Sequence, residues 1–458
     1  MKLFYLLLSC VLLLTSSVAR ATTRAGQEYV DAYFISACAG SCLGVYSPFH
    51  SLEFDYMRSY GWDVTPYLLK SEGVEANFAM AQNYFDELDQ NVYVLTVRGS
   101  ASKGDFQIDL KTRKAAYEPE DAVFVNAKDN KENINNYPLV HYGFDSYTNV
   151  ILKNFVFDEQ GQWKGVFKKI NEDPKAKLFI TGHSLGGAVA TLLGERMVSA
   201  GMPKDKFEVI TFGAPAIGNK VFAERYGDRI NLKRVTNTND PIPGGLQTFF
   251  DNYQQFGTNI KYHLSPRISG VQHDITMYFD YSVNEAFKER DRQVALGNVQ
   301  AEPYVKTTPG KPVVALWMNA AKHMSDIAYI TDTKRMIQDE YKDLLPSYIV
   351  MSDKINMDDF RNYDIIQTSK DAGADYVLIV NIEGSKSQTM QYHYLAVEQV
   401  LFDKDGNMLA MENVSRKVSP SVGNIQAAEQ NFFTARKTLL EKLPFLNQVK
   451  KPRLFTGH

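Results

Sequence analysis

Apolar positions along the chain form two successive patterns, and the first begins near Asn77. Short, continuous apolar stretches alternate there with longer segments of helical periodicity. Strands that are apolar throughout and alternate with helices predict an α/β fold with a mainly parallel sheet covered on both faces. The expected strands are residues 91–100, 177–181, 207–215 and 230–240, and the expected helices are residues 144–171, 185–200 and 219–226.

The second pattern follows residues 301–312, a stretch rich in proline, glycine and threonine that has the composition of a linker. Strands and helices alternate again beyond it, with a hairpin around Asp405 and Gly406. We therefore expect a larger domain at residues 22–300 and a second, smaller α/β domain at residues 313–458. A chain that ends in the linker is expected to fold, because a domain of this size can bury its own core.

The amino-terminal residues 1–21 have the layout of a cleaved secretory signal peptide. One lysine precedes an apolar run from Leu3 to Leu14, and small residues follow as far as Ala21. We expect cleavage after Ala21 and export to the periplasm, the envelope or the medium. An uncleaved anchor is the alternative, but the apolar run is shorter than a membrane-spanning helix requires.

Net charge and cysteine content limit the kinds of binding partner and cofactor that we expect. A formal net charge of −3 and a pI near 6.3 argue against nucleic acid as the main partner. Cys38 and Cys42 are spaced as neighbours on a helix face, so in an exported chain they are either a disulfide or two small buried residues. Since no histidine or further cysteine lies nearby, these cysteines are not expected to form a zinc site. The serine chemistry considered below needs neither a metal nor an organic cofactor, so we expect none.

The sequence GHSLG at residues 182–186 fits the nucleophile elbow G-x-S-x-G. An apolar strand precedes it and an apolar helix follows, which is the context that this turn requires. Glycines two positions before and after the serine avoid collisions in a tight turn. Ser184 is therefore the expected nucleophile, and the Leu185 amide is an expected oxyanion donor. His183 is expected to be a packing residue of the turn.

A catalytic serine needs a base, and the base needs an acid to orient it. In this type of site the acid follows the serine and the histidine comes last. Asp240 is the best acid, because Pro241 ends its strand and places it at the same sheet edge as the serine. Asp228 and Asp251 are the competing candidates.

Two histidines could act as the base. His273 lies in a loop before a helix that Asp274 could cap, whereas His263 lies in an alternating, strand-like stretch. The loop position favours His273. At the end of an earlier strand, Ser100 could supply a second oxyanion donor through its amide and hydroxyl groups.

At these motifs the chain resembles the class 3 lipases, the fungal-type branch of the α/β-hydrolase fold. The resemblance extends from about residue 32 to residue 287. It rests on seven stretches in the family's order: RGS (98–100), DFQIDL (105–110), VHYGF (140–144), GHSLGG (182–187), TFGAPAIGN (211–219), NDPIP (239–243) and HDITMY (273–278).

The resemblance implies a hydrolase of lipid or carboxyl esters, with Ser184, Asp240 and His273 as its triad. It implies an oxyanion hole made by Ser100 and Leu185. The implied partners are a lipid or ester substrate and, at most, a membrane surface.

The resemblance also implies a mobile lid between the serine at 100 and the VHYGF stretch. Residues 117–137 are more polar than a usual lid, and the separation between Asp240 and His273 is short for the family. The substrate class therefore stays open among acylglycerols, phospholipids and soluble esters.

The second domain has only a faint similarity to small α/β domains of bacterial envelope lipoproteins. Its histidines, at residues 323, 393 and 458, are scattered and form no catalytic pattern. The competing hypothesis is therefore an envelope binding or assembly protein that uses this domain and carries a degenerate hydrolase scaffold.

Overall fold

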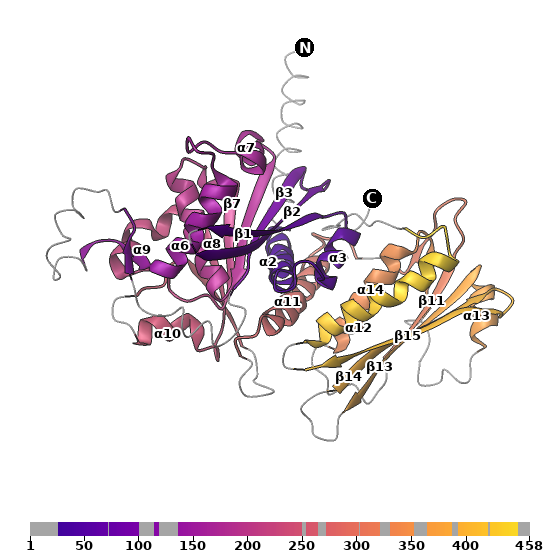
Figure 1. The fold of residues 1–458 in the computed structure, drawn as a ribbon. Coiled ribbons are helices and arrows are strands. Elements are labelled where there is room, and N and C mark those ends of the chain that lie inside the picture. The colour runs from indigo at the N-terminus through magenta and orange to yellow at the C-terminus, as the bar shows by residue number, and fades with distance from the viewer. Residues whose placement is uncertain are drawn as a thin grey trace, which may run out of the picture.

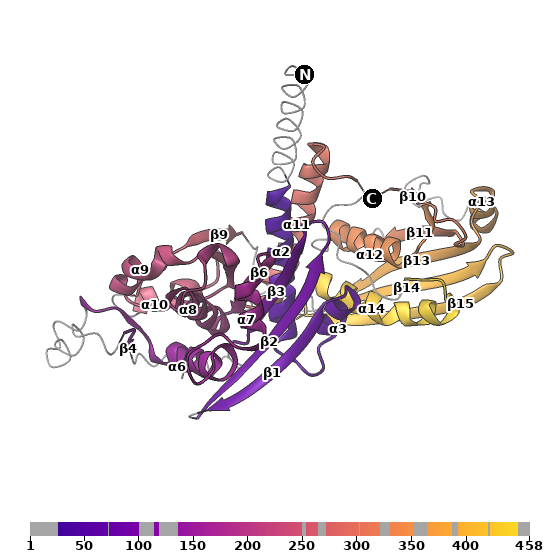
Figure 2. The ribbon, with the colours of Figure 1, turned by 90° about the horizontal axis from the view of Figure 1, so that it is seen from above.

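Two β-sheets lie on either side of a helical layer in the computed structural model (Figures 1 and 2). We call residues 26–301 the N-terminal part and residues 303–447 the C-terminal part. The expected signal peptide, Ser100 and most of the expected lid lie outside the described residues. The structure describes residues 26–71, 73–99, 114–118, 136–249, 253–263, 272–301, 303–320, 330–351, 364–386, 393–419 and 422–447.

The sheet of the N-terminal part has seven strands in the order β1-β2-β3-β6-β7-β8-β9. The first three are antiparallel, and those from β3 onward are parallel, which confirms the expected mainly parallel sheet. The strands are β1 (Asp63–Ser71), β2 (Val74–Phe85), β3 (Gln90–Val97), β6 (Ala176–His183), β7 (Phe207–Phe212), β8 (Leu232–Asn237) and β9 (Thr258–Tyr262).

Helices cover both faces of this sheet, and side chains alternate between them along β6. Leu178 and Ile180 join the core on the side of α6, α7 and α8, whereas Phe179 stacks on Phe34 of α2 on the opposite side. This burial on both faces explains why the strands are apolar throughout. The helices are α2 (Gln27–Gly44), α3 (Leu52–Ser59), α6 (Tyr142–Ile151), α7 (Gly165–Glu172), α8 (Leu185–Ser199), α9 (Lys220–Tyr226), α10 (Ile242–Phe249) and α11 (Ile275–Ala295).

One expected helix, at residues 144–171, is divided. α6 continues into a π-helical turn at Leu152–Val156, and the chain then reverses before α7 begins. The Asp158 side chain accepts hydrogen bonds from two backbone amides of the turn, and Gly161 has φ +73°. Such aspartate and glycine turn chemistry interrupts a helix even where apolar residues continue on both sides.

The C-terminal part contains a six-stranded sheet in the order β10-β12-β11-β13-β14-β15. β10 lies inside the segment with linker composition and pairs with β12, so this segment belongs in part to the second sheet. α12 and α14 cover one face, and α13 covers the other. The elements are β10 (Val305–Lys306), β11 (Val314–Ala320), α12 (Ile330–Leu344), β12 (Tyr348–Val350), α13 (Ile365–Asp371), β13 (Tyr376–Lys386), β14 (His393–Asp403), β15 (Met408–Val418) and α14 (Asn424–Lys442).

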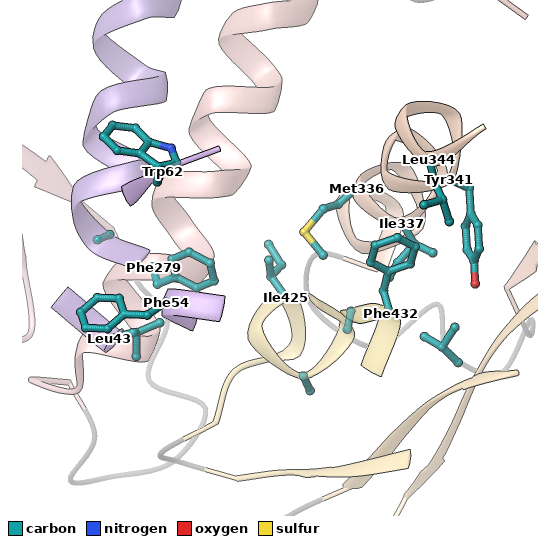
Figure 3. Packing of buried hydrophobic residues seen from close by; sticks show 14 of the residues in the cluster. Leu43, Phe54, Trp62, Phe279, Met336, Ile337, Tyr341, Leu344, Ile425 and Phe432 are labelled. Carbon is teal, nitrogen blue, oxygen red and sulfur yellow. The ribbon is translucent and has the colours of Figure 1, made fainter. Parts of the chain in front are cut away.

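The two parts share one hydrophobic core, which the sequence did not predict. Helices α2, α3 and α11 of the N-terminal part lie opposite α12 and α14, and Figure 3 shows side chains of this core, such as Phe279, Met336 and Ile425. Polar contacts cross the same boundary: Arg290 pairs with Asp339 at 2.8 Å. α11 therefore has one side toward the first sheet and another toward the C-terminal part.

Candidate active site

Ser184 occupies the turn between β6 and α8 in a strained backbone conformation, with φ 58° and ψ −129°. A Cβ atom at Gly182 would lie 2.3 Å from the Gly186 carbonyl oxygen, and one at Gly186 would lie 2.2 Å from the Val97 carbonyl oxygen. The glycines therefore let β6, α8 and the end of β3 approach one another. This confirms the steric reason for the motif and explains how the serine keeps a rare conformation.

His273 joins Ser184 and Asp240 by two hydrogen bonds. Its Nε2 atom lies 2.8 Å from Ser184 Oγ, and its Nδ1 atom lies 2.7 Å from Asp240 Oδ2. The Asp240 side chain is fully buried, whereas a quarter of the His273 side chain is exposed. Because a carboxylate only accepts, Nδ1 carries the hydrogen and Nε2 accepts the serine hydroxyl proton. This arrangement suits proton removal from Ser184.

Short sequence features explain where Asp240 and His273 lie. Asp240 follows β8, so it lies at the same sheet edge as the end of β6. Asp274 caps α11 by accepting the Thr276 amide at 3.1 Å, as expected, and holds His273 just before the helix.

The competing candidates lie elsewhere. His263 is exposed just beyond the end of β9, and Asp228 is exposed in a 3₁₀ turn at Gly227–Arg229. Asp251 lies outside the described residues. The structure thus brings together the serine, aspartate and histidine that the sequence favoured.

Tyr278 supports Asp240, a role that the sequence analysis missed. Its hydroxyl donates to Asp240 Oδ2 at 2.6 Å and accepts the Asn237 amide at 3.1 Å. Burial, with the nearby Asp240 charge, raises the pKa of Tyr278 well above its ordinary value, so this hydroxyl remains a donor. The Ile242 amide donates to the other oxygen of Asp240 at 2.9 Å. The available signal was a tyrosine one turn into the predicted helix.

His183 does more than fill the turn, in contrast to our expectation. Its Nε2 donates to the backbone oxygen of His273 at 2.8 Å, and its Nδ1 accepts the Tyr46 hydroxyl at 2.8 Å. Burial, together with the neighbouring His273, holds the pKa of His183 well below its ordinary value. A neutral His183 therefore fixes the backbone of His273.

The expected oxyanion hole is described on one side only. Leu185 opens α8, whose first amides point out of the helix end. Ser100 lies outside the described residues, but Gly99 lies beside the nucleophile: a Cβ atom there would be 3.5 Å from Ser184 Cβ. This described range of the chain therefore ends, at Gly99, next to the elbow.

The two cysteines of the N-terminal part lie on one helix. Cys38 and Cys42 are free and buried on α2, so the disulfide alternative is wrong. Within the described ranges, no group of three or more histidine, cysteine, aspartate or glutamate side chains could hold a metal ion. No helix of the described chain is long and apolar enough to cross a membrane.

Comparison with known proteins finds a family similarity in the central segment. Residues 94–248 match the class 3 lipases. The matched segment contains Ser184 and Asp240 but ends before His273, which the structure brings to it. The first sheet, with its elbow between β6 and α8, has the α/β-hydrolase organisation.

Two fungal relatives are similar over shorter stretches. The secreted mono- and diacylglycerol lipase 1 of Fusarium solani is 40% identical over 72 residues, which cover 16% of this chain and 21% of the relative. The secreted mono- and diacylglycerol lipase A of Penicillium cyclopium is 32% identical over 108 residues, which cover 21% of this chain and 35% of the relative. The chain therefore spans between about a fifth and a third of these relatives.

A plant relative matches a longer stretch at lower identity. Phospholipase A1-II 1 of Oryza sativa subsp. indica is 28% identical over 183 residues, covering 35% of this chain and 46% of the relative. Among solved structures, the lipase from Rhizopus microsporus var. chinensis is similar with a TM-score of 0.39 and 20% identity, covering 52% of this chain and 76% of that chain.

Proposed function

We propose that this protein is an exported serine carboxyl-ester hydrolase that acts on lipid esters. The observation that carries the proposal is the pair of hydrogen bonds from His273 to Ser184 and Asp240 at the elbow. The match of residues 94–248 to the class 3 lipases supports the same chemistry.

In the proposed reaction, Ser184 attacks the ester carbonyl carbon while His273 removes the hydroxyl proton. The developing oxyanion receives hydrogen bonds from the Leu185 amide and from Ser100. His273 then donates its proton to the leaving alcohol, and an acyl-enzyme forms. Water repeats the sequence and releases the fatty acid. Asp240 keeps the imidazole in the required tautomer and stabilises its positive charge.

The substrate and the location are also proposals. The named relatives include mono- and diacylglycerol lipases and a phospholipase A1, so acylglycerols and phospholipids are the substrate classes to compare. Export is supported by the signal-like layout of residues 1–21 and by the word "secreted" in two relatives' names. A substrate of this kind would be met at a membrane or lipid surface.

The test is hydrolysis by the purified full chain of p-nitrophenyl esters of graded length, a diacylglycerol, a triacylglycerol and a phosphatidylcholine. We expect hydrolysis, and covalent labelling by a fluorophosphonate. Ser184→Ala should remove both, with a loss on the order of 10⁶-fold in kcat. Ser199→Ala, on the exposed end of the same helix, is the matched control. Undiminished hydrolysis by the folded Ser184→Ala protein would disprove the nucleophile.

A further inference from the structure

A partly open cavity of about 240 Å³ lies between the two parts of the protein, and Ser184 is not among its lining residues. Its walls come from α2, α3 and α11 of the N-terminal part and from α12 and α14 of the C-terminal part. Figure 3 shows Trp62 and Phe279 near α2 and α11, with Met336 across from them on α12. A volume of this size can hold a small organic molecule but not a long acyl chain.

Aromatic rings form much of the lining. The rings belong to Tyr29, Tyr33, Tyr56, Tyr60, Trp62, Phe279 and Phe287. Aromatic faces carry a partial negative charge and attract cations, most strongly where water is excluded. The lining therefore offers apolar contacts, and its aromatic faces also attract cations.

The same lining contains more acidic than basic side chains. Arg290 is the one lysine or arginine among the described lining residues, and it already pairs with Asp339 at 2.8 Å. Two further carboxyl groups have neutral donors: Glu53 accepts from Gln426 and Gln430, and Glu340 accepts from tyrosine hydroxyls. The remaining acids of the lining are Asp343 and Glu429.

Glu429 on α14 is the lining group that most requires a partner. Its side chain belongs to a residue only 5% exposed, and its Oε2 atom has no hydrogen-bond partner among the described residues. Burial, then the charges of Glu53 and Glu340, raise the pKa of Glu429 well above its ordinary value, which favours the neutral acid. A cation bound beside this group would favour the carboxylate instead. Buried polar atoms without partners are rare in folded proteins, because each costs free energy.

We propose that this cavity binds a small alkylammonium ion, such as a choline-like cation, with Glu429 as its carboxylate partner and the aromatic rings around its methyl groups. A fatty acyl chain or another neutral apolar ligand would leave the Glu429 carboxyl unpaired. A bare metal ion is disfavoured, since no described group of side chains could hold one. The ligand would contact both parts of the protein, so its binding would stabilise their association. The site is separate from Ser184, and its existence does not depend on the proposed hydrolase activity.

The test uses the full chain and isothermal titration calorimetry with choline chloride and tetramethylammonium chloride, against sodium chloride at equal ionic strength. The matched neutral ligand is 3,3-dimethylbutan-1-ol, which has the shape of choline without its charge. We expect saturable binding of the two cations, a higher unfolding temperature, and binding of the neutral alcohol that is at least about tenfold weaker. Equal binding of the alcohol, or absence of binding by both cations, would overturn the proposal.

Variants then test whether Glu429 is the carboxylate that binds the cation. Glu429→Gln keeps the shape of the side chain and should weaken choline binding by about tenfold or more. Glu441→Gln, exposed on the same helix, should bind as the wild type does. If Glu429→Gln fails to fold, Trp62→Leu provides the second variant and should lose affinity for the cations more than for the neutral alcohol. Unchanged choline affinity in folded Glu429→Gln would contradict the assignment.

Discussion

The two parts of the protein use their buried polar groups in different places. In the N-terminal part, Asp240 and His273 meet Ser184 at the edge where the parallel strands end. In the described residues of the C-terminal part, the buried acids Glu340 and Glu429 lie instead on helices that face the N-terminal part. The edge of a parallel sheet can bring a nucleophile, a base and an acid together. Helices at an interface hold two parts of a protein together. The candidate catalytic residues therefore lie within the first part, whereas these buried acids of the second part lie at the boundary between the two.

The strongest way to break this comparison is to remove the C-terminal part. The linker composition led us to expect that a chain ending in the linker would fold alone. The shared core changes this expectation, because Phe279 and other apolar side chains of α11 and α3 would lose their cover. We now expect a chain ending at residue 301 to be aggregated or unfolded, and therefore inactive. Size-exclusion chromatography, circular dichroism and hydrolysis of a short soluble ester would measure this.

A folded, monomeric and fully active protein from that truncation would reverse the interpretation. The two parts would then be independent, and the cavity between them would be dispensable for the fold.

The next largest effect concerns the histidines of the N-terminal part. His273→Ala should lower kcat about as much as loss of the serine, on the order of 10⁶-fold, because triad residues act as a unit. His263→Ala is the matched control and should remain within about tenfold of the wild type, since His263 is exposed at the end of β9. Ester hydrolysis at saturating substrate would distinguish them, and a reversed result would make His263 the base.

Asp240→Asn should have a smaller but still large effect. The amide would keep the shape of the side chain and favour the wrong tautomer of His273, at a cost on the order of 10⁴-fold in kcat. Unchanged circular dichroism would show that the loss is chemical. An effect below about tenfold would mean that another acid orients the histidine.

The smallest effect sharpens the role of Tyr278 as a positioning residue. Tyr278→Phe removes the hydrogen bond to the charged Asp240 carboxylate and also the acceptor of the Asn237 amide. A hydrogen bond to a charged group contributes about 1.5–3 kcal/mol, so we expect kcat to fall by on the order of tenfold to a hundredfold while KM changes little. Tyr262→Phe is the matched control, because it removes a buried hydrogen bond to Ser282 that does not touch Asp240. If both variants lower kcat equally, the effect is structural rather than specific to Asp240.

Sequence patterns could predict the parts of the site that depend on neighbouring residues. The elbow follows from glycines within two positions of Ser184, and the place of Asp240 follows from a strand that stops at Pro241. These features are local steric requirements, so they can be recognised in a short stretch of residues.

The missed features depend on contacts between distant segments. His183 and Tyr46 are 137 positions apart, and no local pattern joins them. The shared core could not be predicted for the same reason: α3 and α14 each look like an ordinary amphipathic helix until the fold brings them together. The division of the helix expected at residues 144–171 depended on turn chemistry that the apolar periodicity concealed.

The position of α11 also affects when the candidate site can finish folding. Its first turns carry Tyr278 and follow His273, and its Asp280 side chain lies against the start of α14 at residues 423–426. Ribosomes deliver α14 long after the nucleophile, and earlier segments can fold as they emerge. If α11 reaches its final position only after it packs against α14, a chain without α14 contains Ser184 but does not yet hold His273 in place. The candidate site would then be complete only after α14 has been synthesised and has packed against α11.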